Sequence, residues 1–145
     1  MKVSVIVPTL NNVTLGDTLR AIENQTHPPD ELIVVGRDEM GITQAFPQVR
    51  FVDTERPMCA AAARNIGMKM AKGDIFIFTD SDCIPNPDWV AQHLSLQQQG
   101  KQIVGGGVVI ANPNYWAESD NISMFHEFLH THPQGKRNDY SLHLI

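Results

Sequence analysis

The chain has 145 residues, of which 42% are hydrophobic and 19% are charged, a balance typical of a single folded domain rather than a disordered chain. Its net charge of −5 disfavours binding to nucleic acid, which requires a clustered basic surface. The two cysteines are too few for a disulfide-built secreted domain, and no apolar run approaches the ~20 residues that cross a bilayer. We expect a cytoplasmic protein, with the inner face of the membrane as an alternative place of action.

The chain opens with a predicted buried strand and a helix. Residues 3–7 are β-branched at four of five positions, and Pro8 is expected to end this strand. Apolar residues then recur at helical spacing over residues 14–24. Thr14 and Asp17 resemble a capping box at the start of that helix.

The middle of the chain continues the alternation. Residues 32–35 predict a second buried strand that Gly36 closes, and residues 48–52 predict a short third strand. The alanine-rich residues 59–70 predict a helix with a narrow, closely packing face. Residues 75–78 then form the most hydrophobic predicted strand, which leads directly into an acidic segment.

The rest of the chain predicts a helix, a strand and a further helix. Asn86 is expected to cap a helix that ends at Gly100. Residues 103–111 predict a strand with three consecutive glycines, which indicate a bulge or the close approach of another group. Residues 115–129 predict a helix with apolar residues on one side.

Strands that alternate with helices predict βαβ units, right-handed crossovers and a largely parallel sheet, and therefore an α/β fold. In such sheets, ligands bind beside the carboxyl ends of the strands. Three segments fall at such ends, namely Pro8-Thr9, Gly36-Arg37-Asp38 and Asp80-Ser81-Asp82. We expect these segments to form one shared site.

The acidic segment is the first candidate for chemistry. Asp80 and Asp82 are two carboxylates one residue apart at the mouth of a buried strand, where they repel each other and are costly to desolvate. A divalent cation removes both costs, and oxygen ligands of this kind suit Mg²⁺ or Mn²⁺. The alternative is an ordinary acidic turn that caps the next helix.

Arg64, on the alanine-rich helix, is the second candidate. Its guanidinium can bind a carboxylate or a phosphate through two parallel hydrogen bonds. The alternative is a structural ion pair with an acidic loop residue, including one of the two aspartates. Both roles are compatible, because a structural arginine can shape the loop that holds a nucleotide.

Four segments together resemble the large family 2 of glycosyltransferases. They occur in the family's order and at sensible spacing, and are Val3–Thr9, Pro29–Val35, Ala62-Ala63-Arg64-Asn65-Ile66-Gly67 and Gly73–Asp82. The likeness covers roughly the first ninety residues well and the remainder loosely. It implies the GT-A fold, a Rossmann-like three-layer αβα arrangement with a mostly parallel sheet.

The resemblance also implies roles for individual residues. Pro8 and Thr9 would lie beside the nucleoside, Asp80 would face the ribose or the sugar-phosphate, and Asp82 would be the principal metal ligand. The implied activity is metal-assisted transfer of a sugar from a nucleotide-diphosphate sugar to the hydroxyl of an unknown glycan, lipid or protein acceptor. The implied cofactor is Mg²⁺ or Mn²⁺.

The chain departs from the family pattern at two places. Where the family places an aspartate that reads the base, this chain has Gly36, Arg37 and Asp38, so Asp38 from a shifted position or Arg37 is expected to bind there. Family domains also continue further, and their catalytic base lies in the later acceptor-binding half. We therefore expect residues 1–145 to form a single nucleotide-sugar-binding domain that lacks most of that half, with the base beyond Ile145.

Three alternatives follow from the same residues. The first alternative is a shortened domain that binds a nucleotide without catalysing a reaction. In a shortened domain, the C-terminal helix over residues 115–129 would be exposed, and we expect it to mediate self-association. A sugar nucleotidyltransferase is disfavoured, because residues 8–12 contain no glycine for a phosphate loop. His126 and His130 have zinc-binding spacing, but the sequence offers no clear third ligand.

Overall fold

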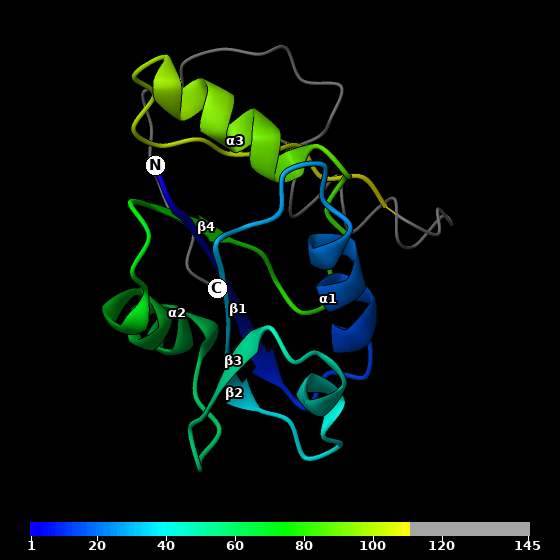
Figure 1. Ribbon diagram of the computed structural model, residues 1–145. Helices are drawn as coiled ribbons and strands as arrows, with labels where there is room; N and C mark the ends of the chain where they lie inside the picture. The colour runs from blue at the N-terminus through cyan, green and yellow to red at the C-terminus, as the bar shows by residue number, and fades with distance from the viewer. Residues whose placement is uncertain (111–145) are drawn as a thin grey trace. The chain divides into compact units, whose positions relative to one another are not determined.

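Four parallel strands form the centre of the first part of the chain (Figure 1). The structure is a computed structural model that describes residues 1–110, and the chain divides after Gln99 into two units. In the first unit the strand order is β3-β2-β1-β4, and every neighbouring pair is parallel. The strands are β1 (Val3–Leu10), β2 (Glu31–Arg37), β3 (Val49–Asp53) and β4 (Ile75–Phe78). The helices are α1 (Leu15–Glu23), the 3₁₀-helix η1 (Ile42–Ala45), α2 (Ala60–Met70) and α3 (Trp89–Gln98). The predicted α/β class is confirmed.

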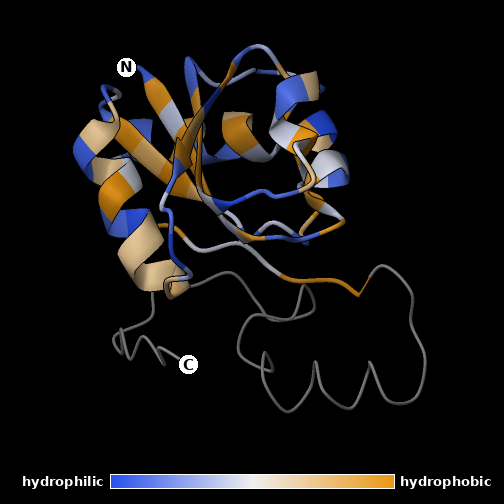
Figure 2. Cartoon of the chain, turned by 90° about the horizontal axis from the view of Figure 1, so that it is seen from below, coloured by the Kyte–Doolittle hydropathy of each residue, from blue (hydrophilic) through white to orange (hydrophobic). Residues whose placement is uncertain are grey.

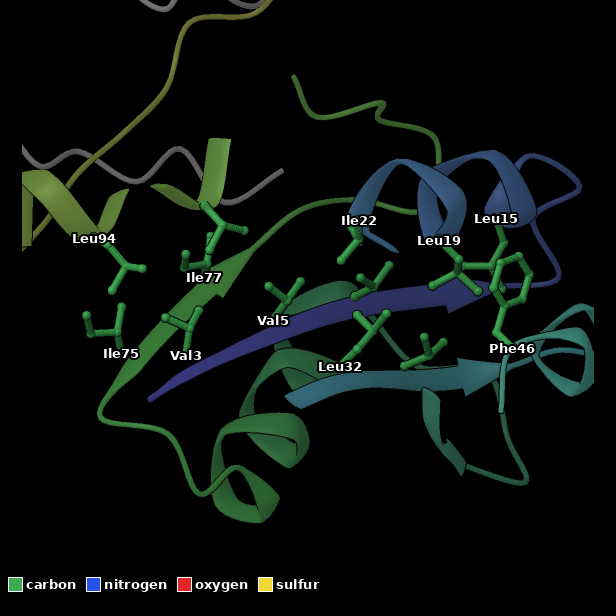
Figure 3. Packing of buried hydrophobic residues seen from close by; sticks show 13 residues of the cluster. Val3, Val5, Leu15, Leu19, Ile22, Leu32, Phe46, Ile75, Ile77 and Leu94 are labelled. Atoms are coloured by element: carbon green, nitrogen blue, oxygen red, sulfur yellow. The ribbon is translucent and has the colours of Figure 1, made fainter. Parts of the chain in front are cut away.

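Helices lie on both faces of the sheet, which explains why the two central strands, β1 and β2, are mainly apolar and buried. Alternate residues of β1, such as Val5, pack with α1 and α3 in one cluster of buried side chains (Figure 3). The intervening residue Ile6 packs with Ala63 of α2 in a second cluster on the other face. In Figure 2, hydrophobic residues, in orange, are frequent along the strands, whereas the helices carry both hydrophobic and hydrophilic residues. The three layers are thus helix, sheet and helix.

Strand β1 is longer than predicted, because it continues through Pro8 to Leu10. Main-chain groups of a strand point alternately to its two neighbours, so Pro8 faces the same neighbour as Ile6. The Ile6 carbonyl accepts a hydrogen bond from the Thr79 amide at 3.5 Å, just after β4 has ended at Phe78. The missing N–H of Pro8 therefore falls where β4 no longer needs a donor, and the strand continues.

Strand β2 also continues past its predicted end, through Gly36 to Arg37. Gly36 has a φ of 141°, and a Cβ atom there would lie 1.8 Å from the carbonyl oxygen of Thr9. No other residue fits this close approach of two main chains. Gly36 therefore permits the pairing of β1 with β2 at this end of the sheet rather than stopping β2.

The predicted capping box of α1 is wrong. Thr14 is the N-cap residue, but its side chain makes no capping hydrogen bond. Its hydroxyl instead lies 2.7 Å from Oδ1 of Asn12 and 3.1 Å from the carbonyl oxygen of Ser81. Asp17 forms a 2.7 Å ion pair with Arg20. The hydroxyl is thus used to connect two loops.

Beyond β4, the predictions hold in part. Helix α3 begins at Trp89, after the N-cap Asp88 rather than Asn86, and Gly100 follows it with a φ of 81°. Residues 103–110 form no strand, apart from an isolated bridge at Val108, so the strand predicted there is wrong for the part described. The helix predicted over residues 115–129, and the self-association expected through it, lie outside the described residues.

Within residues 1–110, the helices are too short or too polar to cross a bilayer.

Candidate functional site at the carboxyl ends of the strands

The structure brings the three predicted segments to one edge of the sheet. Thr9 pairs with Gly36, and Leu10 pairs with Arg37, where β1 and β2 end. On the other side of β1, the segment after β4 is joined to the segment after β1 by a 3.2 Å hydrogen bond from Asn12 Nδ2 to Ser81 Oγ. This edge is where parallel α/β sheets bind their ligands.

Pro8 and Thr9 lie at this edge as predicted, but their side chains are buried. Thr9 is only 7% exposed, and its hydroxyl has no hydrogen-bond partner among the described residues. The side chain of Thr9 follows the alternation of β1 and points to the face that α1 covers. Contact of these two residues with a nucleoside stays a prediction.

Arg64 and Asp80 form an ion pair at this edge. Nη2 of Arg64, on α2, donates to Oδ1 of Asp80, just beyond β4. The Arg64 side chain is 29% exposed and the Asp80 side chain 54% exposed, so the pair lies at the surface of the site. Nε of Arg64 is buried and has no partner among the described residues. The structural role predicted for Arg64 is confirmed, and its role toward a phosphate stays a prediction.

Asp82 is the more available of the two aspartates. It is exposed, and the Cys83 thiol lies 3.8 Å from its Oδ1 as a weak hydrogen-bond donor. Burial raises the pKa of that thiol, and the charges of Asp82 and Asp80 raise it further. Cys83 therefore stays a protonated thiol, which is able to donate to the carboxylate of Asp82.

The described residues do not form a complete metal cage. Among residues 1–110, no cluster of three or more histidine, cysteine, aspartate or glutamate side chains is arranged to hold a metal ion. Mg²⁺, however, usually takes one or two carboxylates and completes its shell with phosphate and water oxygens. Asp82 fits such a site as a ligand, whereas Asp80 is already paired with Arg64.

Asp38 lies at the edge, but its carboxylate is hydrogen-bonded to neighbouring residues of its own loop. Its carboxylate accepts hydrogen bonds from the amides of Ile42 and Thr43, at 3.0 and 2.8 Å, and from the Thr43 hydroxyl at 2.8 Å. Burial raises the pKa of Asp38, but these hydrogen bonds outweigh it and leave the pKa below its ordinary value. Asp38 thus caps η1, and its role in reading a base stays a prediction.

Arg37 is held in a similar way. It donates to Asp53 at 3.0 Å and to Glu39 at 3.2 Å. The hydrogen bond to Glu39 and the charge of Asp53 raise the pKa of Arg37. The Arg37 guanidinium therefore joins the loop after β2 to the end of β3. Its contact with a base or a phosphate also stays a prediction.

Two asparagines at the centre of the edge were missed by sequence reasoning. Asn11 and Asn12 follow β1 directly and bond to the segments after β2 and β4, respectively. The signal was their position, since consecutive amide side chains after a buried strand are suited to joining neighbouring loops.

A hollow of about 360 Å³ lies elsewhere, at the opposite ends of the strands, and is lined by residues that include Ile22, Pro28 and Glu31.

Comparison with known proteins gives a consistent result. The model of the family described as glycosyl transferase family 2 matches residues 4–144. Glycosyltransferase AglE of Haloferax volcanii is 28% identical over an alignment of 148 positions, and the match covers 94% of this chain and 49% of that protein. Hyaluronan synthase of Pasteurella multocida is 34% identical over an alignment of 114 positions, and the match covers 70% of this chain and 12% of that protein. The chain thus spans about half of AglE and less of the synthase.

Solved structures share the fold. TarS of S. aureus superposes with a TM-score of 0.61 at 25% identity, over 75% of this chain and 23% of TarS. The mannosyltransferase PcManGT of Pyrobaculum calidifontis, solved with GDP-Man and Mn²⁺, has a TM-score of 0.59 at 26% identity, over 81% of this chain and 37% of that protein. These matches and the family model agree with the four segments that resemble the family. The chain belongs to glycosyltransferase family 2.

Proposed function

We propose that this chain forms the nucleotide-sugar-binding part of a transferase that moves a sugar from a nucleotide-diphosphate sugar to an acceptor hydroxyl. The observation that carries the proposal is the meeting of three strand-end segments at one edge, with the exposed carboxylate of Asp82 beside the Arg64–Asp80 pair. The relatives support it, since TarS has been solved with UDP and with UDP-GlcNAc, and PcManGT with GDP-Man and Mn²⁺.

Asp82 is the residue proposed to hold a divalent cation, Mg²⁺ or Mn²⁺. Its carboxylate is exposed and is an oxygen ligand of the type that these ions prefer. When bound, such a cation offsets the charge that develops on the leaving diphosphate as the sugar–oxygen bond breaks. PcManGT, solved with Mn²⁺, supports this choice of ion.

Asp80 and Arg64 are proposed to act together on the donor. Arg64 holds one oxygen of the Asp80 carboxylate, which fixes the direction of the other oxygen. That second oxygen is suited to accept a hydrogen bond from a ribose or sugar hydroxyl. Arg64 has further N–H donors, so it remains able to contact a phosphate oxygen. Pro8, Thr9, Arg37 and Asp38 are proposed to surround the nucleoside.

The test is calorimetric titration of the chain with UDP and with GDP, each with and without Mn²⁺. The wild-type chain is expected to bind one of them in a Mn²⁺-dependent way. Asp82→Asn is expected to weaken that binding by about tenfold or more, because loss even of a group that only supports a metal ligand has an effect of this size. Asp74→Asn is the matched control, because Asp74 is an exposed aspartate just before β4, at its opposite end. It should leave binding unchanged.

Failure of the wild-type chain to bind either nucleotide in Mn²⁺ would contradict the proposal. If binding is observed, a donor-turnover assay with Mn²⁺ separates a transferase from a module that holds the nucleotide without chemistry. Measurable hydrolysis or transfer of the donor sugar favours the transferase.

A further inference from the structure

We propose that Asn11 and Asn12 are positioning residues that fix the loop after β2 and the acidic segment after β4 relative to each other. This inference rests on the proposed function, since it assigns the first loop to the nucleoside and the second to the diphosphate and its cation. Neither asparagine is proposed to contact the substrate. Their action is exerted through Glu39 on one side and Ser81 on the other.

Asn11 holds the loop after β2. Its main-chain amide donates to the main-chain carbonyl of Arg37 at 2.9 Å, and its side-chain Oδ1 accepts a hydrogen bond from the main-chain amide of Glu39, also at 2.9 Å. Both groups of Asn11 are thus bonded to residues on either side of Asp38. Asn11 has a φ of 52°, a left-handed conformation that asparagine adopts more readily than most residues.

Asn12 holds the acidic segment after β4. Its Nδ2 donates to Ser81 Oγ at 3.2 Å, and its Oδ1 accepts from the amide of Thr14 at 2.9 Å. The Thr14 hydroxyl lies within reach of both Asn12 Oδ1 and the Ser81 carbonyl, so its single proton is shared between them. Ser81 is held by its side chain and by its main chain.

The position of Ser81 gives this bonding its consequence. Ser81 is 7% exposed and stands between Asp80 and Asp82, whose side chains are exposed. Ser81 and Asp82 lie in a turn that a 3.2 Å hydrogen bond from the Cys83 amide to the Asp80 carbonyl closes. Holding the buried Ser81 therefore restrains the short stretch of main chain that carries both exposed neighbours. The two asparagines are adjacent in sequence, so one planar peptide unit connects the residue that holds the first loop to the residue that holds the second.

The two residues should therefore affect different parts of nucleotide binding. Loss of Asn12 loosens the acidic segment and should reduce the gain in affinity that Mn²⁺ provides. Loss of Asn11 loosens the loop after β2 and should reduce affinity equally with and without Mn²⁺. A residue that merely stabilised the fold would not produce this split.

The experiment measures the affinity for whichever of UDP or GDP the wild-type chain binds, with and without Mn²⁺, in Asn12→Ala and Asn11→Gly. Glycine is used at position 11 because it keeps the positive φ accessible. Asn12→Ala is expected to lower the ratio of the two affinities by about tenfold, the size that one or two lost hydrogen bonds allow. Asn11→Gly is expected to lower both affinities about threefold or more and leave their ratio unchanged.

Ser4→Ala is the matched control. Ser4 is a buried residue near the opposite end of β1, and its hydroxyl bonds to Glu31 at 2.7 Å and to the amide of Gly73 at 3.0 Å. It should lower the thermal midpoint and leave both affinities unchanged below that midpoint. Ser81→Ala keeps Asn12 and loses only the hydroxyl contact, so it tests the same bond if Asn12→Ala fails to fold.

The outcomes are distinguishable. A reduced Mn²⁺ effect in Asn12→Ala and Ser81→Ala, with no further reduction in the double variant, supports the inference. An Mn²⁺ effect within twofold of the wild-type value in Ser81→Ala and in any folded Asn12→Ala overturns it, while the proposed function stands. Absence of nucleotide binding by the wild-type chain overturns the proposed function itself, and the inference with it.

Discussion

Gly67 on α2 lies so close to β1 that a Cβ atom there would stand 2.5 Å from Cγ2 of Ile6. Arg64 lies one helical turn earlier on the same helix, and Ile6 pairs with Phe78 at the end of β4. The close approach that Gly67 permits therefore brings Arg64 within reach of Asp80, two residues beyond Phe78. A packing requirement between helix and strand thus supports an ion pair in the site.

Replacement of Gly67 by alanine should destabilise the chain. The added methyl meets the side chain of Ile6 at a distance that real Cβ contacts do not show, and such overpacking costs about 1–3 kcal/mol. Gly16→Ala is the matched control, because Gly16 is also helical and its added Cβ would meet Ile42 at an ordinary 3.5 Å. Urea unfolding should show a loss of stability for Gly67→Ala and a gain of up to about 1 kcal/mol for Gly16→Ala. Equal shifts in the two variants would contradict this account.

Arg64→Ala should affect binding more than stability. The ion pair with Asp80 is part-exposed, and such pairs contribute less than about 1 kcal/mol to the free energy of unfolding. Without Arg64, the Asp80 carboxylate loses its fixed direction, so nucleotide affinity should fall by about tenfold. Arg64→Lys should recover little of it, because an ammonium lacks the planar set of donors. Full recovery of calorimetric affinity by lysine would show that the charge alone matters.

The sheet could be predicted from the sequence because its central strands, β1 and β2, are buried on both faces and so appear as nearly continuous apolar runs. Strand β4 is apolar throughout, although only one of its faces is buried. The ends of the strands could not. Pro8 and Gly36 are ordinary signals for a break, yet both lie inside strands. The N–H that Pro8 lacks faces a side where β4 has ended, and Gly36 is required by the close approach of Thr9. Such reasons depend on the neighbouring strand, which a local pattern does not contain.

The candidate site could be predicted to a similar extent. The rule that ligands bind at carboxyl ends placed its segments at one edge, and the chemistry of two neighbouring carboxylates selected Asp80 and Asp82 within it. The bonds among those segments could not be predicted. Binding of a base by Asp38 or Arg37 stays a prediction, but the bonds from the Asp38 carboxylate to the first amides of η1 have no clear sequence signal. The link from Asn12 to Ser81 joins residues 69 positions apart, so it depends on strand register.

Gln25→Ala should loosen the start of α3. Gln25 is 5% exposed, its Nε2 donates to the Asn86 carbonyl at 2.7 Å, and its Oε1 accepts from the Val90 amide at 3.0 Å. Truncation leaves these groups without that partner, at a cost of about 1–3 kcal/mol. Gln99→Ala is the control, because Gln99 is exposed and its contact with Ser95 is a long 3.4 Å. Faster amide exchange at Val90 in Gln25→Ala alone would support the anchor, and unchanged exchange would refute it.

Asp38 should make the stability of the chain depend on acid pH. Its pKa is lower in the folded chain than the ordinary 3.8, so the folded state binds fewer protons than the unfolded state. The stabilisation is therefore fully present above that ordinary value and is lost as the pH falls below it, through the pKa of the folded state. Asp38→Asn removes the charge that the amides of Ile42 and Thr43 stabilise, and should cost about 1 kcal/mol near neutral pH.

The measurement is the free energy of unfolding between about pH 6 and pH 3, in the wild-type chain, Asp38→Asn and Asp17→Asn. The curve for Asp38→Asn should start lower and decline less at the acid end, so that it converges on the wild-type curve. Asp17→Asn should run close to the wild-type curve throughout, because Asp17 is exposed in its pair with Arg20. A constant offset between the curves for Asp38→Asn and the wild type would mean that the cap acts through shape and not through charge.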